Sequence, residues 1–219
     1  FTFPASLTDF GQGDFIGCSS LTKINIPSSV ISIPDECFRD CSSFVEIIIP
    51  SSITLIGKSA FKGCSSIIQL TIPSSVVSIG DECFIGCSKL QNLIIHSSIQ
   101  SIGKCLFKGC SSLSDFIIPS SVVSINDDAF NNCLSLTEIN IPSSVTFIGN
   151  GAFYMCESLC DIIFEEKSSL ISIGNNAFCG CSSISQLMIP SSVTSIGNNA
   201  FSGCSYMSQI SIPSSLESL

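Results

Sequence analysis

The stretch IPSSVTSIGNNAFSGCSYM, residues 189–207, is one copy of a unit that recurs along almost the whole chain of 219 residues. Its proline recurs every 23 residues, at Pro4, Pro27, Pro50, Pro73, Pro119 and Pro142, and resumes at Pro190 and Pro213. His96 replaces one proline, and a two-residue insertion around 165–167 shifts the later copies. A period in this range is typical of repeat proteins, so the repeat decides how every other feature is interpreted.

Two columns of the unit count its copies. The phenylalanines are Phe15, Phe38, Phe61, Phe84, Phe107, Phe130, Phe153, Phe178 and Phe201. Three residues after each one comes a cysteine, namely Cys18, Cys41, Cys64, Cys87, Cys110, Cys133, Cys156, Cys181 and Cys204. Other apolar columns keep the same step, for example Ile33, Ile56, Ile79 and Ile102. The sequence therefore contains nine copies of one structural unit.

The first half of the unit predicts a short strand and a corner. In 136–141, Ile139 and Ile141 are separated by one residue, which is the period of a strand with one buried face. Pro142 has no N–H to donate and should end the strand, and the two serines after it should make the corner.

The second half of the unit predicts a second short extended segment over 145–148 and a return over 150–156. Gly149 between them indicates a turn where a side chain would be unwelcome, and Pro34 and Asn126 are the exceptions in this column. We expect the return to be a tight turn or a short 3₁₀ or helical segment.

No single unit can enclose its own apolar columns, whereas stacked units place each phenylalanine on the next. The sequence therefore predicts a mostly β solenoid of stacked parallel strands. Nine copies spaced at the usual strand separation would extend on the order of 45 Å. We expect residues 1–219 to form one domain and to be an excerpt of a longer array, since both ends lie within a repeat.

The pattern of residues 189–207, with methionine in a column that is usually leucine, resembles the BspA-like leucine-rich-repeat family, also called the treponemal type. The resemblance covers nearly the whole chain and implies a leucine-rich-repeat solenoid. It also implies a role, because the family is associated with surface proteins of oral and gut bacteria and of mucosal protists. Such proteins attach to host matrix proteins or to other cells, but the resemblance assigns no binding residue.

Composition excludes several classes of partner. The formal net charge is −9, and only eight Lys and Arg are scattered along the chain, which disfavours nucleic acid and anionic membranes. Apolar residues reach 45 %, but their runs break within a few positions, far short of the roughly 18 residues that span a membrane. We therefore expect no nucleic-acid partner and no direct membrane insertion.

The fourteen cysteines raise the question of disulfides or metal. Nine share one column, where stacked side chains point the same way and form poor disulfide pairs, so buried thiols are expected. Cys37 and Cys83 stand in the alanine column and should also be buried, whereas Cys105, Cys160 and Cys179 are candidates for exposed thiols. The spacings lack the double Cys-x-x-Cys of a zinc site, so no metal or other cofactor is expected.

Catalysis is also not expected. His96 is the single histidine, and its place in the proline column indicates a substituted corner residue rather than a general base. Acidic pairs such as Asp81-Glu82 and Asp127-Asp128 fall in the polar turn after the glycine column, where solvated acids are common.

The outward positions of the first strand form two rows, and they carry the functional hypothesis. The polar row is Lys23, Glu46, Gln69, Asn92, Asp115, Glu138, Asp161, Gln186 and Gln209. The mixed row is Asn25, Ile48, Thr71, Ile94, Ile117, Asn140, Ile163, Met188 and Ser211, and five of its nine members are Ile or Met. An apolar stripe on a surface marks interaction, although β-branched residues also simply suit strands.

The residues expected to contact a protein partner are Ile48, Thr71, Ile94, Ile117, Ile163 and Met188, edged by Glu46, Gln69, Asn92, Asp115, Glu138 and Asp161. The first hypothesis is a non-catalytic, adhesin-like module at the cell surface or secreted, binding host or neighbouring-cell proteins. The alternative is a cytoplasmic scaffold or a self-assembling stack, with association through the repeat ends. The thiol content mildly favours the alternative, since exposed thiols oxidise outside the cell.

Overall fold

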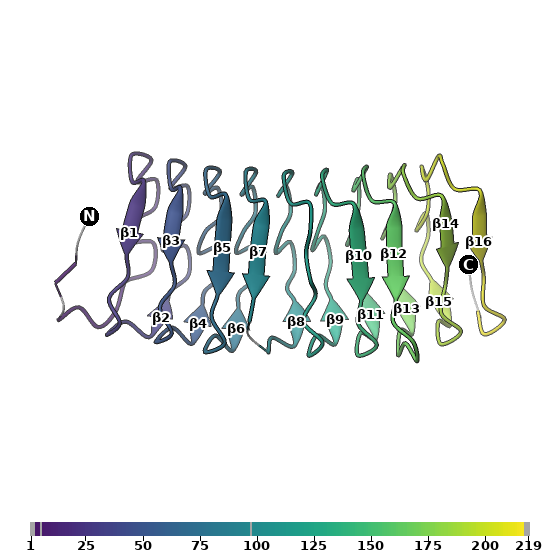
Figure 1. Cartoon of the computed structure of the whole chain (residues 1–219), viewed down its shortest axis with the longest axis horizontal. Helices are drawn as coiled ribbons and strands as arrows, with labels where there is room; N and C mark the ends of the chain where they lie inside the picture. Colours follow the sequence, from purple (N-terminus) through teal and green to yellow (C-terminus); the bar gives the residue numbers. More distant parts are fainter. Residues whose placement is uncertain (1–2, 5, 97, 217–219) are drawn as a thin grey trace.

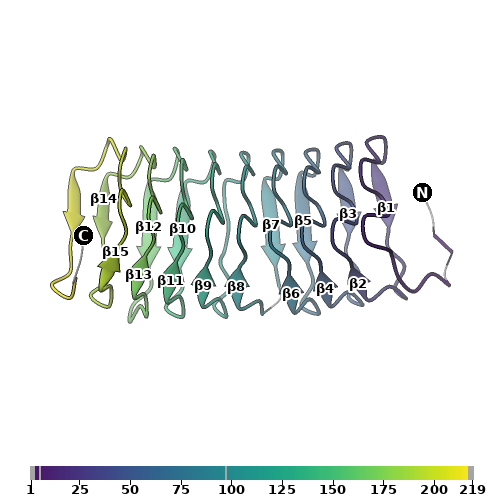
Figure 2. The same ribbon diagram turned by 180° about the vertical axis from the view of Figure 1, so that it is seen from behind.

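Two files of short parallel strands run the length of the chain (Figures 1 and 2). The computed structural model describes residues 3–4, 6–96 and 98–216. The first file consists of β1 (Lys23–Asn25), β3 (Glu46–Ile48), β5 (Gln69–Ile72), β7 (Asn92–Ile95), β10 (Glu138–Ile141), β12 (Asp161–Phe164), β14 (Gln186–Met188) and β16 (Gln209–Ser211). The second file consists of β2 (Ser32–Ile33), β4 (Leu55–Ile56), β6 (Ser78–Ile79), β8 (Ser101–Ile102), β9 (Ser124–Ile125), β11 (Phe147–Ile148), β13 (Ser172–Ile173) and β15 (Ser195–Ile196).

Pairing is parallel and follows the repeat. Lys23 is in register with Glu46, and Glu138 with Asp161. Across the insertion Ile148 is in register with Ile173, so the two extra residues are absorbed outside the strands. The predicted solenoid is confirmed, with its two ends at opposite ends of the stack (Figure 1).

The first file is not one continuous sheet. It pairs as β1 with β3, β5 with β7, β10 with β12 and β14 with β16. Between β7 and β10, the segment 115–118 forms only an isolated bridge, from Asn92 to Asp115. The second file forms a three-stranded and a five-stranded sheet. We call the outward surface of the first file, together with 115–118, the strand face.

Stacked phenylalanines form the centre of the interior. The rings of Phe130 and Phe153 lie 5.1 Å apart with an interplanar angle of 3°, and Phe61 and Phe84 lie 5.7 Å apart at 2°. Seven of the nine column phenylalanines, from Phe38 to Phe178, are fully buried, and Phe15 and Phe201 near the two ends are half-buried. Buried Ile, Leu and Val columns accompany them. Equivalent positions therefore pack on one another, as the repeat predicts.

The column cysteine has a role that packing alone does not explain. The thiol of Cys64 donates to the carbonyl of Phe38 at 3.0 Å, and that of Cys110 donates to the carbonyl of Phe84 at 3.2 Å. The same contact recurs at Cys41, Cys87, Cys133, Cys156, Cys181 and Cys204. Each thiol thus links its repeat to the one before it.

The returns are successive tight turns, which confirms that alternative of the prediction, and the described ranges contain no 3₁₀ or α-helix. Two residues in each return have positive φ, for example Glu36 (57°) and Asp40 (58°). A left-handed residue every fourth position interrupts any right-handed helix. These turns also pair with the next repeat, since Glu36 N–H donates to Lys58 O at 2.8 Å and Phe38 N–H to Ala60 O at 2.9 Å.

The corners and the glycine column behave as predicted. The second serine of most corners links neighbouring repeats by a hydrogen bond, as when Ser144 Oγ donates to Val122 O at 2.6 Å. A Cβ on Gly149 would lie 2.5 Å from the backbone nitrogen of Asp127, so a side chain there would collide with the preceding repeat. In the repeat after the insertion this hydrogen bond is missing, because Ser192 Oγ is buried without a partner.

Candidate protein-binding surface

The strand face presents every residue of the two rows to solvent. In the mixed row the exposed fraction is 58 % for Ile48, 52 % for Ile94 and 86 % for Ile117. Ile163 is 47 % exposed and Met188 is 79 % exposed. The six predicted polar-row residues and Thr71 are exposed as well, because each alternates with a buried neighbour in its strand.

Six of the predicted contact residues surround one shallow hollow. It has a volume of about 410 Å³ over β3, β5 and β7 and is lined by Glu46, Ile48, Gln69, Thr71, Asn92 and Ile94. Its floor is made by their strand neighbours and Pro73. Thr71 is shorter than the isoleucines on either side of it, which accounts for the dip. The hollow therefore joins an apolar rim to carboxylate and amide edges.

The remaining predicted residues lie farther along the same surface, over 115–118, β10, β12 and β14. Here Asp115, Glu138 and Asp161 follow one another in the polar row. At the other end of the row, Glu46 is paired with Lys23 at 2.9 Å. The strand face thus has a nearly neutral half with the hollow and an acidic half that carries Asp115, Glu138 and Asp161.

Comparison with known proteins identifies the family. A sequence model described as the BspA type leucine rich repeat region, in six copies, matches residues 1–114, 77–178 and 123–219. The chain belongs to the BspA-type leucine-rich-repeat family. A leucine-rich repeat protein from Bacteroides ovatus is 28 % identical with a TM-score of 0.69, over 99 % of this chain and 73 % of that one. The T. pallidum leucine-rich repeat protein is 26 % identical with a TM-score of 0.67, over 85 % and 78 %. No curated protein matched.

The cysteines of this BspA-type chain are free thiols, and ten of the fourteen are buried. The prediction that Cys105 is an exposed thiol is wrong, because its side chain is only 8 % exposed. It lies in the first left-handed column, where burial and the nearby Asp128 carboxylate raise the pKa of its thiol. Cys160 and Cys179 are half-buried, and Cys18, expected in the interior, is exposed.

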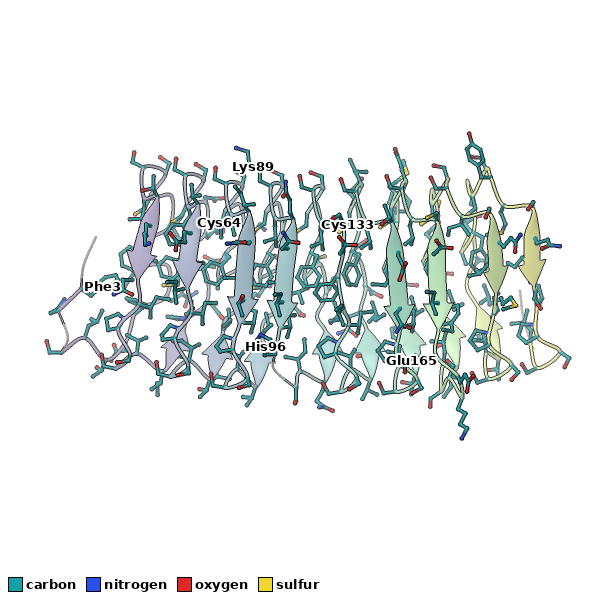
Figure 3. The ribbon with its side chains drawn as sticks, in the orientation of Figure 1. Phe3, Cys64, Lys89, His96, Cys133 and Glu165 are labelled. Atoms are coloured by element: carbon teal, nitrogen blue, oxygen red, sulfur yellow. The ribbon has the colours of Figure 1, made fainter. Side chains whose placement is uncertain are left out.

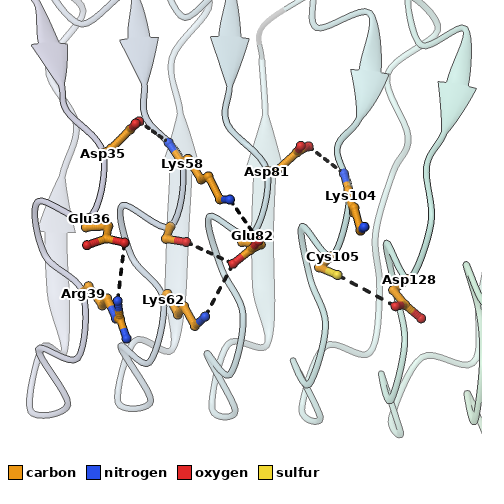
Figure 4. Close-up of polar contacts among 11 residues, drawn as sticks. Asp35, Glu36, Arg39, Lys58, Lys62, Asp81, Glu82, Lys104, Cys105 and Asp128 are labelled. Atoms are coloured by element: carbon orange, nitrogen blue, oxygen red, sulfur yellow. Dashed lines mark hydrogen bonds and ion pairs between the residues drawn. The ribbon is translucent and has the colours of Figure 1, made fainter.

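The acids of the returns were expected to be merely solvated, but they connect repeats (Figure 4). Asp35 Oδ1 accepts from Lys58 N–H at 2.7 Å, and Asp81 Oδ1 accepts from Lys104 N–H at 2.8 Å. The same bond runs on through Asp127, Asn150, Asn175 and Asn198. The recurrence of Asp or Asn directly after the glycine column, interrupted from Asp35 onward only by Lys58 and Lys104, was the signal that could have predicted these bonds.

A charged cluster lies beside these hydrogen bonds. Glu82 is bridged by Lys58 at 3.3 Å and by Lys62 at 3.5 Å. Partial burial alone would raise the pKa of the Glu82 carboxyl, but the two ammonium groups hold it below its usual range. These partners are satisfied within the returns, so the cluster is a structural feature of the stack.

The single histidine, His96, lies at a corner of the stack. His96 is exposed after β7, and its backbone N–H donates to Ile72 O at 3.0 Å, as a corner residue would (Figure 3). Within the described ranges no group of three or more His, Cys, Asp or Glu side chains could hold a metal ion. Among the same residues, no helix is long and apolar enough to cross a membrane.

A second apolar row was not anticipated. It lies beside the second file of strands and includes Ile31 and Val77, which are 62 % and 66 % exposed. In this row the apolar residues Ile and Val alternate from one repeat to the next with the polar residues Thr54, Gln100, Thr146 and Thr194. The row is therefore less continuous than the mixed row of the strand face, and it provides a matched control surface.

Proposed function

We propose that this BspA-type chain is a non-catalytic module that binds a protein through its strand face. The hollow between Ile48 and Ile94 carries the proposal, because it combines exposed apolar side chains with polar groups that can orient a partner. Leucine-rich-repeat proteins of this type generally mediate protein interactions, and the fold supplies an extended surface for that purpose.

We further propose that the module is adhesin-like and acts at the cell surface or after secretion. The association of the family with surface attachment supports this location. The thiols weigh less against it than the sequence suggested, because ten of the fourteen are buried, three are half-buried and Cys18 is exposed, and oxidation requires access. The partners that fit this role are host extracellular matrix proteins or proteins of a neighbouring cell.

The test is a binding screen of the full chain against immobilised extracellular matrix proteins, one at a time, under reducing and oxidising conditions. For any protein that binds, the double variant Ile94→Ser/Ile117→Ser should abolish binding while the melting temperature stays nearly unchanged. Both side chains are exposed, so their loss should cost little stability.

The matched control is Ile31→Ser/Val77→Ser, which removes two apolar side chains of similar average exposure from the other surface. Binding should survive in this control. Loss of binding in both variants, or in neither, would contradict a site on the strand face. A difference between reduced and oxidised samples would point to Cys18 instead.

A further inference from the structure

Three carboxylates stand side by side on the acidic half of the strand face. Glu138 and Asp161 are direct register partners, and Asp115 occupies the same position one repeat earlier. All three are exposed. Like charges directly opposite on neighbouring strands destabilise a sheet, so this row carries a cost that the fold does not require.

Five acids elsewhere in the described part of the chain have a Lys or Arg partner within it, whereas others, such as Asp9 and Glu157, have none. Glu46 has Lys23 at 2.9 Å, Glu82 has Lys58 at 3.3 Å, and Asp128 has Lys108 at 3.3 Å. In the described part of the chain, by contrast, no ion pair involves Asp115, Glu138 or Asp161. Lys89 lies at the upper edge of the molecule, in the turn before β7 (Figure 3). The negative charge of this row is therefore available to a cation outside the chain.

The mixed row runs directly beside these acids and reads Ile117, Asn140, Ile163 and Met188 in successive repeats. Ile117 is 86 % exposed and Met188 is 79 % exposed, the two highest values among the large apolar side chains. Ile163, between them, is 47 % exposed. Methionine adapts to varied apolar surfaces and is common at sites that bind helices. A complementary partner would present basic and apolar side chains in two adjacent parallel rows.

The repeat spacing favours a helix as that partner. Neighbouring parallel strands are about 4.8 Å apart, which sets the step between repeats on the strand face, and the column rings in the interior lie 5.1 to 5.8 Å apart. An α-helix advances about 5.4 Å per turn, so residues about one turn apart would meet successive repeats. If the partner were an extended strand, the side chains on its one face would be about 6.8 Å apart. After two repeats they would no longer lie opposite the equivalent side chains of this chain. Basic and apolar rows are also the ordinary features of an amphipathic helix.

We propose that the acidic half of the strand face binds a basic amphipathic helix of a partner protein, lying along the solenoid axis. Its Lys or Arg side chains contact Asp115, Glu138 and Asp161, and its apolar side chains contact Ile117, Ile163 and Met188. This inference rests on the proposed protein-binding function and specifies the chemistry of the partner.

The probe is a fluorescein-labelled peptide of about 18 residues, with Lys and Leu in adjacent helical rows, which is long enough to fold on binding. A scrambled peptide of identical composition serves as the second probe. We expect the full chain to bind the first peptide, with an increase in helical circular dichroism. Binding should weaken when salt is raised from about 50 to about 300 mM.

The decisive variant is Asp115→Asn/Glu138→Gln/Asp161→Asn, which removes charge with little change in shape. It should weaken binding of the helical peptide about tenfold or more. The charge-matched control is Asp9→Asn/Glu157→Gln/Glu166→Gln, whose three exposed acids lie outside both rows. Affinity in this control should stay within about twofold of the original chain.

Two results would overturn the inference. Equal binding of the scrambled peptide would mean that charge alone attracts the probe. Binding that survives the triple neutralisation but is lost in Ile94→Ser/Ile117→Ser would refute the basic helix and leave the proposed protein-binding function intact. The screen against matrix proteins decides that broader function independently.

Discussion

The interior and the strand face share one 23-residue period, yet they differ in how much each copy varies. Inside, the same phenylalanine recurs nine times, and the cysteine after it recurs with it. Outside, the polar row changes from Lys23 through amides to three successive acids. A stacked core requires equivalent neighbours, whereas a solvated row tolerates any polar residue. The uniform columns therefore specify the fold, and the varied rows are where binding can be specified.

The largest effect on stability should come from deprotonating the buried cysteine thiols at high pH. Burial raises the pKa of the Cys110 thiol to about 12, and burial, with nearby Asp14 and Cys41, does the same at Cys37. Burial likewise raises the pKa of the Cys87 and Cys133 thiols. An unfolded thiol has its ordinary value of 9.0, so the stabilising protonated form persists below about pH 9 and its contribution is lost as pH rises toward about 12.

Each such thiol should lower the free energy of unfolding by about 1.4 kcal/mol per pH unit above pH 9. Several act together, so the chain should unfold well before the end of that range. Urea denaturation between pH 8 and about pH 11 measures this slope. The variant Cys110→Ala should show a shallower slope, and a stability independent of pH above 9 would refute the mechanism.

The second contrast sets one interior ring against one exposed side chain. Phe130 is fully buried and contacts Phe107, Phe116 and Phe153. Phe130→Ala should cost about 3 to 5 kcal/mol, since it leaves a cavity between repeats. Ile117→Ala, at a side chain that is 86 % exposed, should change stability by less than about 0.5 kcal/mol. Chemical denaturation measures both losses of stability. If Phe130→Ala and Ile117→Ala lowered the free energy of unfolding by similar amounts, the interior and the strand face would not differ in their contribution to stability.

The sequence predicted the period, the buried columns and the outward rows because strand alternation alone decides them. It did not predict the turn conformation of the returns. Glu82 and Met155 have positive φ, although neither residue type signals it. Those conformations are imposed by hydrogen bonds between repeats, such as Glu82 N–H to Lys104 O at 2.9 Å. Such bonds exist only after stacking, so local propensity cannot reveal them.

The candidate site was predictable to a similar degree. Alternation identified which side chains point outward, but the hollow depends on the relative lengths of Ile48, Thr71 and Ile94 across three repeats. That contrast is present in the sequence once the rows are aligned. The burial of Cys105 was not readable in this way, because it depends on the left-handed turn that holds it near Asp128.

The smallest effect concerns the glycine column, where neighbouring repeats approach each other at a corner. A Cβ on Gly149 would lie 2.5 Å from the backbone nitrogen of Asp127, whereas one on Gly103 would meet the Asp81 Oδ1 side-chain atom at 2.8 Å and backbone only at 3.6 Å. A side chain can rotate away, but a hydrogen-bonded backbone must shift the whole repeat. Gly149→Ala should therefore cost about 1 to 3 kcal/mol, and Gly103→Ala clearly less. If the Gly149→Ala and Gly103→Ala variants unfolded at the same urea concentration, the backbone at the corners would be able to shift without cost. Close packing between repeats would then be confined to the interior.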